Sequence, residues 1–583
     1  MLHTLSRSLR ENKGPALVTV LLSALEVVFE IVIPLFMSNL IDFGIEGGSM
    51  AAVWKFGAFL LLLAAFQLAT GVLAARIAAR ASVGFAANLR EDMYNNVQTF
   101  AFSNIDKFST ASIVTRLTTD TTNVQNAFQM LMRMAIRAPV MLIFSMIVSF
   151  RISRDISMTF LIILPILALA LLFIIRSVFP VFSRVFRTYD ELNNVVQENV
   201  RGIRVVKSFN QEWHEIGKFG AISERIYKDF SKGERLITLN APLMQFCIYT
   251  CMIVISWLGA KAIIASGNDP ALGLTTGNLT ALITYTMQIL SSLMMLSMVF
   301  AMLTISLSSA RRIAEVLEEQ SDIPQPEQPV MTVRDGAVDF DHVSFVYASK
   351  ADKKVLDDID LHIRSGETIG IIGGTGASKS SLVQLIPRLY DVTGGKLTLG
   401  GVDVRDYDLD TLRGAVAMVL QKNELFSGTI KENLRWGNEN ATDEELQHAC
   451  VLACADEFIS AMPDGYDTHI EQGGTNVSGG QKQRLCIARA LLKKPKVLIL
   501  DDSTSAVDTR TDAQIQQALS TYIPDTTKII IAQRISSVQN ADRIVVLDDG
   551  RIDAVGCHDE LLRTCEIYRE VYESQQKGGE DDA

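Results

Sequence analysis

The sequence has little cysteine, no excess of positive charge and no regular Cys/His spacing, and each shortage excludes a class of protein. The 7 Cys residues among 583 show no framework spacing, which argues against a disulfide-bonded secreted fold and fits reduced thiols. The net charge of −11 argues against a nucleic-acid-binding protein, because neutralising phosphates requires a basic surface. With 48% hydrophobic and 20% charged residues, the chain is too apolar for an average soluble protein and too charged for a membrane bundle alone. It therefore has two unlike halves.

The apolar residues are concentrated before residue 310, in runs long enough to cross about 30 Å of hydrocarbon as helices. The first run is too long for a signal peptide and lacks an A-x-A-like cleavage site, so we expect a retained membrane anchor. Cys247 and Cys251 lie four apart in such a run, as Cys450 and Cys454 do in a soluble stretch, and both pairs are interpreted as small buried hydrophobes. The six runs lie near 15–41, 56–78, 134–153, 157–180, 241–264 and 277–307.

The connections between the runs are unequal and indicate an orientation. Runs two and three, and four and five, are separated by long polar segments that favour helix and carry many Arg and Lys residues. Since positive loops tend to stay in the cytosol, we expect these segments, the N-terminus and everything after residue 310 to be cytosolic. Arg151 and Arg154, in the short connection between runs three and four, count against this orientation.

A second change in composition begins at residue 318, where prolines and acids end the helical pattern. Beyond it, short β-branched strands alternate with helical stretches, which predicts a parallel α/β sheet. The predicted fold is an α-helical transmembrane domain, with six long helices and cytosolic extensions, fused to an α/β domain. The predicted boundaries are 1–317 for the membrane domain, 318–335 for a linker, 336–574 for the α/β domain and 575–583 for an acidic tail.

Residues 373–380 read GGTGASKS between a predicted strand and a predicted helix, which is the position of a P-loop. In this motif backbone N–H groups surround the phosphates, Lys379 supplies a cation and the Ser380 hydroxyl ligates magnesium. Ser378 stands where glycine is usual. The residues predicted to hold nucleotide here are Gly373, Gly374, Thr375, Gly376, Ala377, Ser378, Lys379, Ser380 and Ser381. The predicted α/β domain at 336–574 is therefore an α/β P-loop nucleotide-binding domain.

Two further motifs support a nucleotide site. The strand VLIL at 497–500 delivers Asp501 and Asp502, and Asp501 is where a magnesium-coordinating acid belongs in a P-loop fold. Between the P-loop and this strand lie Ser478, Gly479, Gly480 and Gln481, at a helix start whose free N–H groups could hold an anion.

With these motifs in place, the chain resembles a half-transporter of the ATP-binding-cassette (ABC) family, of the type IV exporter kind. The resemblance implies ATP and Mg²⁺ as cofactors, Tyr347 as the aromatic that stacks on adenine, and Gln421 as the glutamine that senses magnesium and water. It also implies that Ser505 to Asp508 form the loop that crosses to a partner cassette. The stretches at 105–120 and 202–212 resemble the segments that dock membrane helices on the cassettes.

Two residues depart from the family pattern at the catalytic positions. The family has a glutamate after the magnesium-binding aspartate, where this chain has Asp502, and one missing methylene can forfeit much of a typical 10²–10⁴-fold contribution from a general base. The family has a histidine where this chain has Gln533, which can donate a hydrogen bond but cannot carry charge. Asp502, Gln533 and Gln421 are thus the predicted catalytic set, and Ser380, Gln421 and Asp501 the predicted magnesium ligands.

An impaired site beside an intact SGGQ predicts a heterodimer, since cassettes of this family pair head to tail. The expected partner is a second, non-identical half-transporter with the glutamate and the histidine, and a slow homodimer is the alternative. The predicted function is ATP-driven export of amphipathic drugs across the cytoplasmic membrane by alternating access. A lipid or lipopeptide flippase, a peptide exporter and a non-transporting nucleotide sensor are the alternatives.

Glu26 and Glu30 are the candidate substrate contacts in the membrane. Carboxylates inside a membrane segment are costly and often functional, so these two could attract lipophilic cations. A structural role near the cytosolic vestibule is the alternative. Five methionines in the sixth run could form an adaptable substrate surface or plain filler: Met287, Met294, Met295, Met298 and Met302.

Overall fold

The structure is a computed structural model that describes residues 1–269, 273–347, 354–503 and 506–580. The chain forms two compact units. One, the helical unit, comprises Met1–Gln98 and Thr110–Glu319, and the other, the α/β unit, comprises Thr99–Ser109 and Gln320–Ala583. The segment Thr99–Ser109 belongs to the α/β unit although it precedes Gln320 by more than 200 positions.

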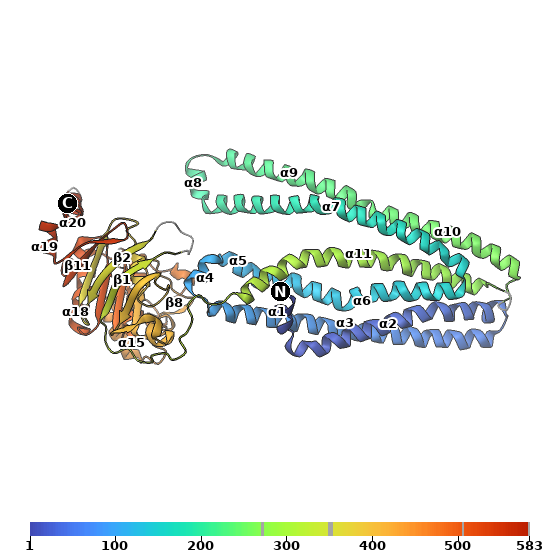
Figure 1. Ribbon diagram of the computed structural model, residues 1–583, viewed down its shortest axis with the longest axis horizontal. Coiled ribbons are helices and arrows are strands. Elements are labelled where there is room, and N and C mark those ends of the chain that lie inside the picture. The colour runs from blue at the N-terminus through green and yellow to red at the C-terminus, as the bar shows by residue number, and fades with distance from the viewer. Residues whose placement is uncertain (270–272, 348–353, 504–505, 581–583) are drawn as a thin grey trace. The chain divides into compact units, whose positions relative to one another are not determined.

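The helical unit is built from very long helices (Figure 1). Within the described residues six are long and apolar enough to cross a membrane, which confirms the predicted helical transmembrane domain. The polar separators extend the apolar runs as continuous helix, so that α3 reaches 49 residues and α7 reaches 48. The elements are α1 (Leu2–Arg7), η1 (Arg10–Asn12), α2 (Lys13–Asn39), η2 (Leu40–Glu46), α3 (Met50–Gln98), α5 (Thr110–Thr115), η3 (Arg116–Asp120), α6 (Thr121–Ile152), α7 (Arg154–Arg201), α8 (Ile203–Ser208), α9 (Glu212–Thr238), α10 (Asn240–Ser266) and α11 (Thr276–Glu318).

Apolar clusters among the described residues hold these helices together. Phe160 lies in the cluster shared by α7, α10 and α11, and Tyr285 in the one shared by α2, α6 and α11. Ile222 lies in the cluster that joins α9 to α7, and Figure 1 shows these two helices running side by side. Cys247 and Cys251 are buried among apolar neighbours, as predicted, and so is Cys450, whereas Cys454 is half-buried.

The described residues of the α/β unit form three sheets. A mostly parallel sheet has the strand order β12-β11-β3-β10-β9-β6, with β12 antiparallel at its edge, and an antiparallel sheet has the order β2-β1-β4-β5. The third sheet pairs β7 with β8. The strands are β1 (Val338–Phe345), β2 (Leu356–Ile363), β3 (Thr368–Gly373), β4 (Gly394–Leu399), β5 (Val402–Asp403), β6 (Val416–Val419), β7 (Gly428–Thr429), β8 (His469–Ile470), β9 (Val497–Asp501), β10 (Thr527–Ile531), β11 (Arg543–Asp548) and β12 (Arg551–Gly556).

Helices accompany these strands, as the alternating pattern predicted. They are α4 (Phe102–Lys107), α12 (Lys379–Gln384), α13 (Leu409–Ala415), α14 (Ile430–Arg435), α15 (Asp443–Leu452), α16 (Asp456–Ser460), α17 (Gly479–Leu492), α18 (Thr509–Tyr522), α19 (His558–Thr564) and α20 (Glu566–Glu580), with short turns η4 (Val404–Asp406), η5 (Gly465–Asp467), η6 (Gln472–Gly474) and η7 (Ile535–Ser537). The helix α20 runs past residue 574, so the part of the predicted tail that the structure describes is helical.

The topology of the large sheet decides where chemistry can occur. The parallel strands β3, β9, β10 and β6 end at the same edge, because Ile531 is in register with Ile371 and Asp501, and Val419 with Leu500. Ligands of parallel α/β sheets bind outside the carboxyl ends of the strands. The P-loop follows β3, Gln421 follows β6, Asp502 follows β9 and Gln533 follows β10.

Candidate functional site

The loop after β3 has backbone requirements that two of its glycines meet. A Cβ on Gly373 would lie 2.1 Å from the Leu547 carbonyl oxygen, so no larger residue fits. Gly376 has a φ of +89°, in the left-handed region that favours glycine. The predicted positions Gly374, Thr375 and Ala377 complete this loop, and Ser381 lies in the first turn of α12.

Ser378 adopts the same left-handed backbone, with φ 67° and ψ 22°. Glycine takes this conformation without penalty, whereas a residue with a Cβ pays about 1–2 kcal/mol. The departure from the usual P-loop sequence therefore falls where the backbone requires glycine, and the strain is local to the residue before Lys379.

The side chain of Lys379 folds back over its own loop. Its Nζ donates to the carbonyl oxygens of Gly373 at 2.7 Å and Gly374 at 2.8 Å. Burial lowers its pKa, and the nearby carboxylates of Asp501 and Asp502 oppose that shift. The ammonium group is thus held where the loop would present it to an anion.

Ser380 and Asp501 form a pair of oxygen ligands. The Ser380 hydroxyl donates to the Asp501 carboxylate at 3.0 Å, and Asp501 is almost fully buried at the end of β9. Burial raises the pKa of Asp501, so a cation beside it would be stabilising. Hydroxyl and carboxylate oxygens suit Mg²⁺, which usually takes few protein ligands and fills its shell with phosphates and water. Within the described residues no group of three or more His, Cys, Asp or Glu side chains could hold a metal alone.

The carboxylate of Asp502 accepts hydrogen bonds from the side-chain amides of Gln533 and Gln421, the other two residues of the predicted catalytic set. Its Oδ2 accepts from Gln533 Nε2 at 2.8 Å and from Gln421 Nε2 at 3.4 Å. Burial raises the pKa of this carboxyl, although the amide hydrogen bonds oppose the shift. The predicted catalytic residues therefore lie together at the carboxyl edge of the sheet, with the carboxylate engaged by two uncharged donors.

The SGGQ segment starts α17 as a capping box. Ser478 Oγ accepts from the backbone N–H of Gln481, and the Gln481 side chain accepts from the Ser478 N–H at 2.9 Å. The Gln481 side chain thus caps the N-terminus of its own helix. The backbone of Ala506 passes close to Gly480: a Cβ at this position would lie 2.8 Å from the Ala506 carbonyl oxygen.

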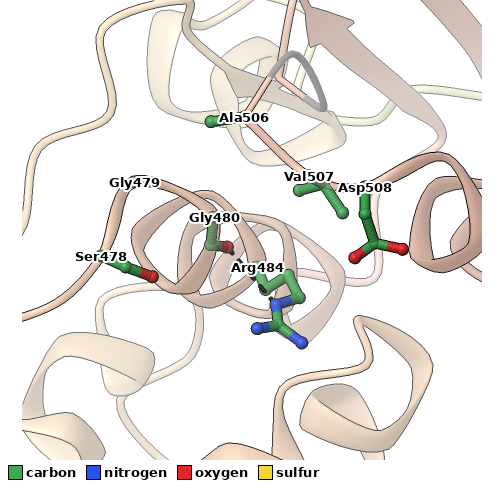
Figure 2. Close-up of a pocket in the computed structure, with 7 residues that line it drawn as sticks. All are labelled: Ser478, Gly479, Gly480, Arg484, Ala506, Val507 and Asp508. Carbon is green, nitrogen blue, oxygen red and sulfur yellow. Dashed lines mark hydrogen bonds between the residues drawn. The ribbon is translucent and has the colours of Figure 1, made fainter. Parts of the chain in front are cut away.

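A cleft of about 320 Å³ opens at this helix start (Figure 2). Arg484, which the sequence analysis did not single out, lines it and donates to the carbonyl oxygens of Gly480 and Cys454, with its guanidinium over the Phe458 ring. Its spacing of one turn after Gly480, at the N-terminal end of α17, could have indicated it. The cleft is lined by Ser478, Gly479, Gly480, Arg484, Ala506, Val507 and Asp508, while Ser505 lies outside the described residues.

Tyr347 belongs to an aromatic cluster that includes a residue bound to α4. Its hydroxyl lies 2.7 Å from Ser381 Oγ, and its ring forms a T-shaped pair with that of Tyr390, with 5.1 Å between centroids. The Tyr390 hydroxyl donates to Asp106 in α4 at 2.8 Å, and Phe102 of α4 packs against the Tyr390 ring. Tyr390 and Asp106 were not predicted individually, because their pairing joins segments 284 positions apart.

Glu26 and Glu30 have a common partner in the helical unit. Arg137 of α6 donates to Glu26 at 2.9 Å and to Glu30 at 2.7 Å, which joins α6 to α2. The Glu26 carboxylate also lies close to α3: a Cβ on Gly71 would be 3.2 Å from its Oε1 atom. The sequence pattern gave no sign of Arg137, whose partners lie on another helix. With both carboxylates ionised, two carboxylates and one guanidinium give the cluster a formal charge of −1.

Comparisons with known proteins agree with this architecture. The family described as "ABC transporter transmembrane region" matches residues 16–309, and the family "ABC transporter" matches residues 356–505. The relative YfiB of Bacillus subtilis (strain 168), described as an uncharacterized ABC transporter ATP-binding protein, is 36% identical over 558 residues, covering 96% of each chain. The relative MT1311 of Mycobacterium tuberculosis, with the same description, is 33% identical over 580 residues, covering 99% of this chain and 98% of the relative.

The chain belongs to the ABC transporter family, as the motifs predicted. The solved structure of a bacterial Atm1-family ABC exporter with ATP bound has the same fold, with a TM-score of 0.82 at 24% identity over 97% of this chain and 99% of that one. A multi-pass membrane domain fused to an ATP-hydrolysing cassette is therefore the class of protein that the sequence and the structure define.

Proposed function

We propose that this chain is one half of a heterodimeric exporter that moves amphipathic small molecules across the cytoplasmic membrane by alternating access, and that its own P-loop site hydrolyses ATP poorly. The observation that carries the proposal is the Asp502 carboxylate bound by Gln533 and Gln421. Lys379, Ser380 and Asp501 are arranged as a phosphate and magnesium site needs, so binding is expected to persist while hydrolysis is weak.

The weakness of hydrolysis follows from the two side chains that would handle the attacking water. Asp502 is the base available at this position, and its carboxylate is occupied by two amide donors. Gln533 can hold a γ-phosphate oxygen by a hydrogen bond but cannot add positive charge as a histidine would. A typical general base contributes 10²–10⁴-fold, and a base that is short and already bonded supplies little of this.

The need for a partner follows from the cleft of the SGGQ helix. Its described lining residues come from α17, the residue before it and the segment 506–508, with none from the P-loop. In the proposed assembly this cleft closes on the nucleotide of a second cassette. A partner with a glutamate and a histidine would then form one competent site together with the SGGQ of this chain.

The proposed direction of transport follows from the fold and the domain order, and the proposed substrate class from side chains of the helical unit. The exporter-like fold and the membrane and cassette domains on one chain favour export, with the N-terminus and the cassette in the cytosol. The cluster of Glu26, Glu30 and Arg137 keeps an excess negative charge, which supports amphipathic cations as substrates. The described side chains among the five methionines of α11 are half-buried or exposed, so they are available to a flexible ligand.

Purification of the chain alone, and together with a second half-transporter that has the glutamate and the histidine and is sought among the neighbouring genes, tests the proposal. ATP turnover of the two preparations in liposomes, together with uptake of a cationic dye, is measured under the same conditions. We expect little turnover by the chain alone, and both turnover and dye transport by the pair. Brisk hydrolysis by the chain alone would show a homodimer, and nucleotide binding without any transport would favour a sensor.

A further inference from the structure

The C-terminal helix α20 is fastened to the α/β unit by one face of its first two turns. Tyr568 is fully buried, and its hydroxyl lies 2.8 Å from His558 Nδ1. Val571 and Tyr572 pack against the same core, and the rings of His558 and Tyr572 form a T-shaped pair with 5.4 Å between centroids. The helix is therefore held firmly up to residue 572.

One turn later the same face presents Gln575. Positions 568, 571, 572 and 575 follow the i, i+3, i+4, i+7 spacing of a single helix face. The Oε1 atom of Gln575 accepts from the backbone N–H of Ile535 at 2.9 Å, and its Nε2 donates to the backbone carbonyl of Gln533 at 2.7 Å. One side chain thus binds the main chain on both sides of Arg534.

The segment 533–537 is the one that carries Gln533 to Asp502. It is bonded at its far end to α18, where the Ser537 hydroxyl donates to Asp512 at 2.6 Å. At its near end the Gln533 side chain donates to Asp502. Gln575 acts between these two points, on the backbone of Gln533 itself, so it restrains the backbone movement that would carry the Gln533 amide away from Asp502.

We infer that Gln575 is a positioning residue for the nucleotide site, acting through the backbone of Gln533, and that α20 sets the place of this switch segment. The inference rests on the proposed function only in giving Gln533 a role at the nucleotide. A displacement of about 1 Å at a reacting group can lower the rate on the order of 10²-fold. Loss of the two hydrogen bonds that restrain this backbone is therefore expected to slow ATP turnover. The sequence placed residue 575 in a solvated tail, where no such role was expected.

Hydrogen exchange of the full chain, measured without nucleotide, tests the geometry directly. Gln575→Ala removes both bonds, and Gln575→Met keeps the side-chain length without them. The neighbouring Gln576→Ala is the matched control, because Gln576 bonds only to the Tyr572 hydroxyl among the interactions described for it. Exchange of the peptide that contains Ile535 should rise roughly three- to tenfold in both Gln575 variants, as expected for a lost hydrogen bond, and stay unchanged in Gln576→Ala.

ATP turnover tests the consequence, in the background of Asp502→Glu with Gln533→His. There Gln575→Met should lower kcat several-fold and change KM for ATP less than twofold. Unchanged exchange at Ile535, an equal rise in Gln576→Ala, or a faster exchange without any effect on kcat in an active background would overturn the inference. If that background does not hydrolyse ATP faster, the proposed function has failed, and the exchange experiment alone decides the role of Gln575.

Discussion

Gln533 and Asp502 are joined by a 2.8 Å hydrogen bond from the glutamine amide to the aspartate carboxylate. Both are departures from the family pattern, and the structure shows that they are neighbours as well. Two substitutions that contact each other are expected to act together, since residues in one hydrogen-bond network give non-additive effects.

The first prediction reverses both substitutions. Asp502→Glu with Gln533→His should raise the ATPase rate of the chain roughly tenfold or more. The added methylene extends the carboxylate toward the attacking water, and an imidazole replaces the Gln533 amide. Each single variant should gain far less. Turnover of the chain alone in liposomes is the measurement, and no gain in the double variant would mean that another feature limits hydrolysis.

The second prediction concerns the strained P-loop residue. Ser378→Gly removes a Cβ at φ 67° and should stabilise the nucleotide-free chain by about 1 kcal/mol. Thermal unfolding in detergent is the measurement. Ser520→Gly is the matched control: it lies exposed inside α18, where glycine should destabilise by a similar amount. A loss of stability in both variants would contradict the assigned strain.

The third prediction concerns the aromatic cluster beside Tyr347. Tyr390→Phe keeps the ring but loses the bond to Asp106, so α4 should dock less firmly while ATP still binds. Substrate stimulation of ATP turnover should fall by a factor of roughly three to ten. Tyr466→Phe is the control, because it removes a similar bond of 2.7 Å to Asp456 elsewhere in the α/β unit. Equal effects of the two variants would mean general destabilisation.

The fourth prediction concerns the charged cluster of the helical unit. Arg137→Met leaves Glu26 and Glu30 without their partner and should destabilise the protein by about 3 kcal/mol, as broken buried ion pairs do. Glu26→Gln with Glu30→Gln in the same chain should recover most of this loss. Thermal unfolding measures both, and a triple variant no more stable than Arg137→Met would contradict the pairing.

The same double variant tests the substrate class. Glu26→Gln with Glu30→Gln, with Arg137 retained, reverses the sign of the cluster from −1 to +1. Transport of a cationic dye should fall at least tenfold while an uncharged analogue is affected less. Equal loss of both would assign these carboxylates a structural role, which is the alternative that the sequence left open.

The sequence could predict which side chains meet at the carboxyl edge because each motif is local. Asp501 ends a strand, Lys379 and Gln421 follow strands within a few residues, and parallel pairing brings those strand ends together. Pairings between distant segments carry no such signal: Arg137 lies more than 100 positions from its carboxylates, and Gln575 lies 40 from Ile535. These contacts depend on packing, which periodicity does not specify.

The last prediction concerns pH and the buried carboxylate. Burial raises the pKa of Asp501, so between the ordinary Asp pKa of about 3.9 and the raised one the folded chain binds more protons than the unfolded chain. Its contribution to stability is therefore complete below the ordinary pKa and is lost as pH rises through the raised one.

Asp501→Asn should raise the unfolding temperature of the nucleotide-free chain at neutral pH and abolish the stabilisation by magnesium and ATP. Asp508→Asn should act oppositely at neutral pH, because hydrogen bonds from the backbone at Thr511 lower the pKa of Asp508. Thermal unfolding from pH 5 to 8, with and without magnesium nucleotide, separates the two, and destabilisation by Asp501→Asn at neutral pH would contradict the assigned cost of burying its charge.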